Sequence, residues 1–351
     1  MSAAAPTGRS QGRWPAAVQR ALLRPRGVAI LIAGVVVLAF PLVEGNDSYT
    51  MSIATEALVY GLAIVTLNLL VGFGGQISLG HAGFLAIGGY TAGVLATHVS
   101  GFPVPIEILA AGAMTALVGF VLGLPTGRLR GHYLAIVTLG FGLAVPEVAL
   151  NWTSLTQGRT GLVVPPPRIG NTEFASAGDL YYFTLVVLVL ALLAIFSILA
   201  SSTGRAFTAV RDSEAGAAAM GINVNRTKVV LFTTSAFFAG VAGDLDAHLQ
   251  GIVSPDSFPL SLSLFFLAAV VVGGLASVPG SLAAAVLLAV VEAKTSSTSG
   301  WEPTIIGATV VAVLLITPGG MADLPRRLAA PVAVWRRGRR GRSPAPAEEK
   351  E

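Results

Sequence analysis

The feature that most constrains this chain is a series of apolar runs, each about as long as a membrane-spanning helix, separated by short polar connections. An α-helix needs roughly 20 apolar residues to cross a bilayer. On that scale the sequence predicts ten spans, at about 28–43, 52–72, 82–98, 106–124, 133–151, 180–200, 229–248, 262–276, 280–294 and 303–317. The predicted fold class is therefore all-α, a polytopic membrane protein with about ten transmembrane helices.

The composition excludes a soluble globular domain. Apolar residues fill 54% of the 351 positions and charged residues only 11%, whereas soluble domains carry about 25% charged residues. Because the chain has no cysteine, disulfides, thiolate metal sites and cysteine nucleophiles are all excluded. The sequence assigns no catalytic residue and no metal ligand.

The chain also lacks a phosphate-binding loop for ATP. A Walker A loop needs a Lys that follows Gly and precedes Ser or Thr. Among the lysines, only Lys294 precedes a Ser or Thr, and Ala293 stands before it. We therefore expect no cofactor in this chain, and any ATP with its Mg²⁺ must bind to another subunit.

The positions of the arginines predict the orientation in the membrane. Cytoplasmic connections carry an excess of Lys and Arg. If the N-terminus is inside, the inner segments 1–27, 125–132 and 201–228 and the C-terminal tail are all basic, whereas the outer connections hold only Arg159 and Arg168. Both termini are therefore predicted to be cytoplasmic.

Three regions follow from this pattern. Residues 1–27 are predicted to form a basic, disordered cytoplasmic arm, 28–320 the transmembrane domain, and 321–351 a basic and acidic cytoplasmic tail. The terminal arginines suit attraction to an anionic membrane surface better than binding to nucleic acid. Membrane lipids are thus an expected partner and nucleic acid is not.

A polar, glycine-rich stretch interrupts the apolar sequence between the second and third predicted spans. Its candidate functional residues are Gly74, Gly75, Gln76, Ser78 and His81. Non-helical backbone at membrane depth is tolerated where it lines a cavity, and broken helices border translocation paths in transporters. The stretch is either an element lining a substrate path or a cytoplasmic turn, and the sequence leaves both interpretations open.

Ionisable residues inside predicted spans are functional candidates, because burying an unpaired charge is costly. Most of them fall near the outer ends of the spans. Only Asp244 is expected near mid-depth, where proton- or sodium-driven carriers usually hold a carboxylate. We retain Asp244 as a candidate path residue, and the scarcity of such groups counts against a secondary carrier.

The polar segment 201–228 lies between two long apolar runs. Phe207 to Met220 is predicted to form a short amphipathic helix, and Gly221 to end it, because glycine accepts positive φ past a helix C-terminus. A short surface helix on a membrane protein suggests a binding site for a soluble partner. An ordinary cytoplasmic loop is the alternative.

Glycine is frequent, with 41 residues in the chain. The pairs Gly89–Gly93 and Gly119–Gly123 are each spaced four apart within apolar helices, which favours close helix packing. A second break is predicted at 277–280, where Pro and Gly follow Ser and Val. The region 262–294 is thus either one bent hairpin or two shorter helices.

Four stretches together resemble the permease family of ABC importers for branched-chain amino acids, the LivM type. They are GFGGQISLGHAGFLAIGGYTAG (72–93), GRAFTAVRDSEAGAAAMGINVNRTK (204–228), GIVSPDSF (251–258) and VVGGLASVPGSLAAAVLL (271–288). Their order and spacing match as well, and the likeness runs from about residue 50 to 320. The chain departs from the wider permease signature with Glu-Ala-Gly in place of Glu-Ala-Ala, and with Gly320 where Leu is common.

This resemblance implies a transport subunit, not an enzyme, in a bacterial plasma (inner) membrane. The implied partners are a second, related permease, two ATP-binding subunits and an extracytoplasmic substrate-binding protein. The segment near 204–225 would be the coupling helix that docks on an ATPase. Its candidate residues are Gly204, Arg205, Arg211, Glu214 and Gly221.

Two alternatives remain at this point. Urea and short-chain amide importers use closely related permeases, and the pathway stretch does not separate them from amino-acid importers. A stand-alone carrier or channel would work without ATPase subunits, and it would leave the segment 204–225 without a role.

Overall fold

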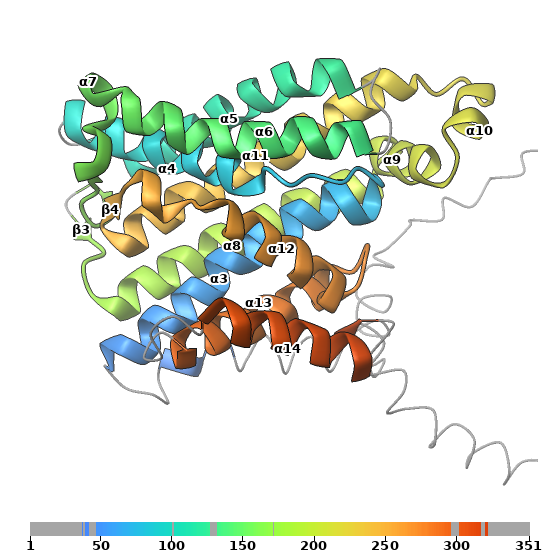
Figure 1. The fold of residues 1–351 in the computed structure, drawn as a ribbon. Coiled ribbons are helices and arrows are strands. Elements are labelled where there is room, and N and C mark those ends of the chain that lie inside the picture. The colour runs from blue at the N-terminus through green and yellow to red at the C-terminus, as the bar shows by residue number, and fades with distance from the viewer. Residues whose placement is uncertain are drawn as a thin grey trace, which may run out of the picture. The chain divides into compact units, whose positions relative to one another are not determined.

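A computed structural model shows a bundle of long helices (Figure 1). It describes residues 47–99, 102–126, 132–170, 172–295, 302–316 and 320–321, together with 37 and 39–41. The predicted arm at 1–27, most of the predicted span at 28–43 and the tail beyond 321 lie outside the described residues. The chain divides into two units after Met51, and every contact discussed below lies within the second.

The long elements are helices throughout, as the sequence predicts. They are α3 (Ser48–Asn68), which continues as the π-helical turn η1 (Leu69–Phe73), α4 (His81–His98), α5 (Val104–Thr126), α6 (His132–Asn151), α8 (Ala177–Ala200), α11 (Val224–Gln250), α12 (Leu260–Gly273), α13 (Val278–Thr295) and α14 (Glu302–Ile316). The region left open between 262 and 294 is two helices, α12 and α13, and not one bent hairpin.

Seven of the described helices are long and apolar enough to cross a membrane. They include every long element above except α4 and α14, which coincide with the predicted spans at 82–98 and 303–317. The chain is thus a polytopic membrane protein. The total of about ten spans stays a prediction.

Short elements gather at opposite ends of the helices (Figure 1). At one end lie α7 (Thr153–Thr156), η2 (Gly158–Thr160) and η3 (Pro255–Ser257), with strand pairs β1–β4 (Leu162–Val163 and Ile252–Val253) and β2–β3 (Arg168–Ile169 and Thr172–Glu173). At the other end lie α9 (Ser202–Asp212) and α10 (Glu214–Ala219). The described parts of the predicted outer connections 152–179 and 249–261 therefore lie at the opposite end from the predicted coupling segment.

The single amphipathic helix predicted from Phe207 to Met220 is wrong. Ser213 is extended, with φ −161° and ψ 110°, and it separates α9 from α10. Its side chain accepts a hydrogen bond from Gly216 N at 3.0 Å and so caps the second helix, because Ser oxygens satisfy the free N–H groups at a helix start. The predicted end is correct, since Gly221 follows α10 with φ +81°.

Helix α11 packs into the bundle through glycines, because a missing side chain lets two helix backbones approach closely. A Cβ on Gly88 of α4 would lie 2.7 Å from Gly240 Cα on α11. The predicted packing role of Gly119 and Gly123 is confirmed, since a Cβ on Gly123 would lie 3.3 Å from Val229 Cα. Figure 1 shows α4, α5 and α11 side by side.

Replacing Gly88 with Val should destabilise the bundle, because the added atoms would meet the backbone of Gly240. Overpacking of this kind costs about 1–3 kcal/mol. A thermal unfolding curve of the purified protein should show a lower midpoint. Gly140→Val is the matched control, since a Cβ there meets nothing within 4 Å; equal midpoints for the two variants would contradict the close approach.

Candidate functional site

The predicted polar break between the second and third spans is a real interruption of the helices. After η1 the backbone leaves the helix at Gly74, and Gly75 adopts φ +66°. Two hydrogen bonds close the turn, from Gly75 N to Val71 O at 3.0 Å and from Gln76 N to Leu70 O at 3.1 Å. Helix α4 does not begin until His81.

The side chains of Gln76 and Ser78 are buried within this break. Their exposed fractions are 4% and 0%. Neither the amide atoms of Gln76 nor Ser78 Oγ has a hydrogen-bond partner among the described residues. Buried polar groups normally have partners, so these two side chains are available to a neighbouring subunit, water or a substrate.

His81 differs from them, because its ring joins the start of α4 to α3. Its Nε2 lies 2.9 Å from Thr66 Oγ1 and 3.1 Å from Ala63 O, while Thr66 Oγ1 donates to Ala63 O at 2.7 Å. Since both neighbours of Nε2 can accept, we infer that Nε2 carries the proton. This arrangement gives His81 a structural role in addition to its place in the break.

A second break lies beside the first, and Asn68 connects them. The Asn68 amide donates to Gly274 O and Ser277 O, both at 3.2 Å, and its oxygen accepts from Ala276 N at 2.9 Å. The same amide also donates to Ser281 Oγ at 2.7 Å. Sequence reasoning missed this residue, although an Asn inside an apolar span, four positions before Gly72, is the signal that could have found it.

The predicted coupling segment contacts the first break directly. Arg211 Nη1 on α9 donates to Gly72 O at 2.9 Å. A Cβ on Gly75 would lie 2.8 Å from Arg211 Cγ, so the glycine allows the arginine to lie against the turn. Arg211 also pairs with Asp212 at 2.8 Å. The polar break and the segment 201–228, which the sequence singled out separately, are therefore in direct contact.

The other coupling candidates attach α9 and α10 to the long helices. Glu214 Oε1 lies 2.6 Å from Lys228 Nζ at the start of α11, and the Lys228 residue is only 5% exposed. Arg205 Nη1 donates to Ala200 O at 3.2 Å. Gly204 packs on the backbone of Leu199, where a Cβ would lie 2.5 Å from Leu199 Cα.

Asp244 does not belong to this cluster. Gly74 of the break packs against Leu231, and Asp244 lies thirteen residues farther along α11. At about 1.5 Å of rise per residue the separation along the helix is about 20 Å. Asp244 is fully buried and lies with Glu107 and His248 toward the opposite end of the bundle.

A comparison with known protein families identifies the family of this chain. The family described as "Branched-chain amino acid transport system / permease component" matches residues 49–318. The chain belongs to this permease family. The resemblance noted in the sequence is thereby confirmed, and the described residues hold nearly all of the matched region.

Several relatives of this permease carry transport names. It is 36% identical to the high-affinity branched-chain amino acid transport system permease protein LivM of Escherichia coli K12, over 85% of this chain and 75% of that protein. It is 26% identical to the LivH permease protein of Salmonella typhimurium, over 77% of this chain and 93% of that protein. It is 27% identical to the autoinducer 2 import system permease protein LsrC of Enterobacter sp. 638, over 75% of each. No solved structure gives a significant match.

Replacing Asn68 with Ala should destabilise this permease, since Gly274 O, Ser277 O and Ala276 N would lose their bonds to the amide. Each buried group left unsatisfied costs about 1–3 kcal/mol. The expected result is a lower unfolding midpoint in detergent. Asn151→Ala is the control, because the Asn151 amide is exposed and bonds to Glu147 within its own helix. A loss no larger than that of the control would refute this role for Asn68.

Proposed function

We propose that this chain is the membrane-spanning permease subunit of an ATP-driven ABC importer for branched-chain or related amino acids. The membership in the permease family supports the transport role. Identity of 36% to a LivM protein and 26% to a LivH protein supports a pair of related permeases, in which this chain takes the LivM position. Two ATP-binding subunits and an extracytoplasmic substrate-binding protein complete the proposed importer.

The observation that carries this proposal is the contact between α9 and the first break. Arg211 joins the segment expected to dock on an ATPase to Gly72 at the end of η1. Lys228 and Glu214 join the same segment to α11. A force applied to α9 and α10 would therefore reach the break and helix α11 through two polar contacts.

Alternating access follows from this arrangement. Binding of ATP and Mg²⁺ would close the two partner subunits and move α9 and α10 with them, and the helices would rock around the path between the permeases. The free energy comes from the differential affinity of ATP for the two conformations. In this proposal the chain makes and breaks no substrate bond, and hydrolysis takes place on the partner subunits.

The proposed path is suited to a small neutral or zwitterionic cargo. Gln76 and Ser78 offer buried donors and acceptors without formal charge, beside the close-packed turn at Gly74 and Gly75. His81 borders the same turn. The proposed location is a bacterial plasma (inner) membrane, with α9, α10 and both termini on the cytoplasmic side, as the distribution of basic residues predicts.

Replacing Arg211 with Ala should uncouple ATP hydrolysis from transport. Loss of a hydrogen bond from a charged donor costs about 1.5–3 kcal/mol, so we expect transport in proteoliposomes to fall by about tenfold or more. Co-purification with the ATPase subunits should persist, because Glu214 and the rest of α10 remain.

Arg226→Ala is the matched control, since Arg226 lies in the first turn of α11 and is exposed. It should transport at the unaltered rate. If Arg211→Ala transports as well as this control, with the same ATPase stimulation, the contact to Gly72 is not part of the coupling route.

Uptake of labelled leucine into proteoliposomes should require the complete complex. It should also require ATP on the side of the membrane where the ATPase subunits are bound. Excess isoleucine or valine should compete with leucine, because their zwitterionic head groups are the same. Competition by urea instead would assign the cargo to amides. Uptake by the purified chain alone would replace the importer with a carrier or channel.

A further inference from the structure

Three ionisable side chains converge at the end of the bundle away from α9 and α10. Glu107 comes from the first turn of α5, and Asp244 and His248 come from the last turns of α11. Residues four apart lie on the same face of a helix, so Asp244 and His248 both face α5. One ligand atom from each residue lies within 4.8 Å of the other two.

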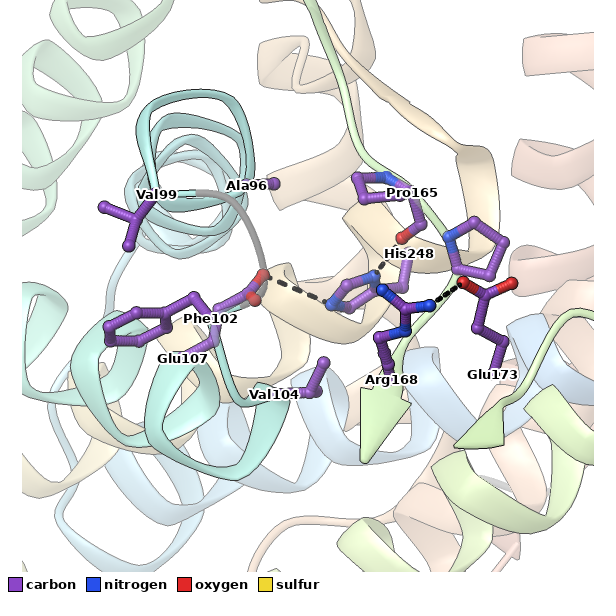
Figure 2. A pocket seen from close by; sticks show the side chains of 10 residues that line it. Ala96, Val99, Phe102, Val104, Glu107, Pro165, Arg168, Glu173 and His248 are labelled. Carbon is purple, nitrogen blue, oxygen red and sulfur yellow. Dashed lines mark hydrogen bonds and ion pairs between the residues drawn. The ribbon is translucent and has the colours of Figure 1, made fainter. Parts of the chain in front are cut away.

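All three residues are shielded from solvent. Their exposed fractions are 3% for Glu107, 0% for Asp244 and 5% for His248. His248 Nε2 lies 3.3 Å from Glu107 Oε1, and Figure 2 shows the two side chains pointing toward each other. A cavity of about 110 Å³ borders Glu107 and His248 and provides access to them.

The hydrogen bond of His248 determines which of its nitrogens is free. Nδ1 lies 2.9 Å from Pro165 O, and a carbonyl oxygen can only accept (Figure 2). Nδ1 therefore carries a proton, and the lone pair of a neutral ring points from Nε2 toward Glu107. A backbone carbonyl that orients the second nitrogen in this way is typical of histidines that bind metal ions.

With a neutral His248 ring, the three side chains present acceptors to one another and no donor. Both oxygens of Asp244 have no hydrogen-bond partner among the described residues, whereas His248 Nε2 and Glu107 Oε1 contact each other at 3.3 Å. The neighbouring Arg168 is paired with Glu173 at 2.8 Å (Figure 2). A proton on Nε2 would satisfy Glu107 but would leave the fully buried Asp244 unsatisfied, whereas a divalent cation would satisfy all three residues at once.

We propose that Glu107, Asp244 and His248 bind one divalent transition-metal ion of the zinc class. One imidazole and two carboxylates form a ligand set that Zn²⁺ takes in proteins, and a nitrogen ligand favours such ions over Mg²⁺ and Ca²⁺. The cavity beside Glu107 and His248 provides the entry route. The ion would join α5 to α11 at the end opposite the coupling segment, and this inference does not depend on the cargo.

The test is equilibrium zinc binding to the full chain, co-expressed with its partner subunits and stripped of metal with a chelator. Competition with a chromophoric zinc chelator should give one tight site per chain, and excess Mg²⁺ or Ca²⁺ should not displace the ion. His248→Gln and the nearly isosteric Asp244→Asn should each weaken binding more than about 100-fold, because loss of an outer-shell partner alone costs about 10–100-fold.

Two controls separate this site from adventitious binding. His98→Gln removes an exposed imidazole at the end of α4, and Glu173→Gln removes a carboxylate from the wall of the same cavity. Both should retain the tight site. Zinc X-ray absorption of the unaltered protein should show nitrogen and oxygen ligands and no sulfur.

The proposal is overturned if the unaltered protein holds no more zinc than Asp244→Asn, with both running as single species in size-exclusion chromatography. Absence of a nitrogen ligand from the absorption spectrum would overturn it as well, even if the substituted chains fail to fold. Either result would assign the cluster to a protonated His248 paired with Glu107.

Discussion

The hydrogen bonds of Asn68 are the interaction on which the rest of this bundle depends. Lipid offers no partner to a free backbone group, so a broken helix must satisfy its N–H and C=O groups inside the protein. Asn68 satisfies Ala276 N, Gly274 O and Ser277 O, and thereby lets α12 end before α13 begins. Because Asn68 lies one turn before Gly72, its hydrogen bonds hold the two breaks side by side.

Local sequence signals predicted much of this fold because local physics produces them. Glycines and polar residues in the sequence indicate the interruption at 74–80. The spacing of Gly119 and Gly123 indicates the close approach of α5 to its neighbouring helix. The separation of α9 from α10 was missed because the apolar and charged periodicity continues across Ser213. The extended backbone of Ser213 ends the first helix, and its side chain caps the second. Long-range contacts lie beyond such signals.

The candidate site was predictable in its parts and not in its assembly. Each of Gly75, Gln76 and Arg211 stands out by residue type and neighbourhood, but no pattern in the sequence says that Arg211 reaches Gly72 across 139 positions. Asp244 was singled out for a different reason. Its place in an apolar span suggested a path residue, whereas the structure groups it with Glu107 and His248, two residues whose relation to it depends on how α5 packs against α11.

Helix α11 therefore carries polar contacts of different kinds at its two ends. At one end Lys228 pairs with Glu214 of α10, and at the other Asp244 and His248 face Glu107. The stretch between them packs through Gly240 and Gly243 against α4, where the backbones are too close to slide without separating. Since protein interiors are close-packed and deform in steps rather than continuously, a displacement of α10 of the kind that the proposed coupling requires would move α11 as one body. A contact that joins α5 to the far end of α11 would then have to resist or follow that movement.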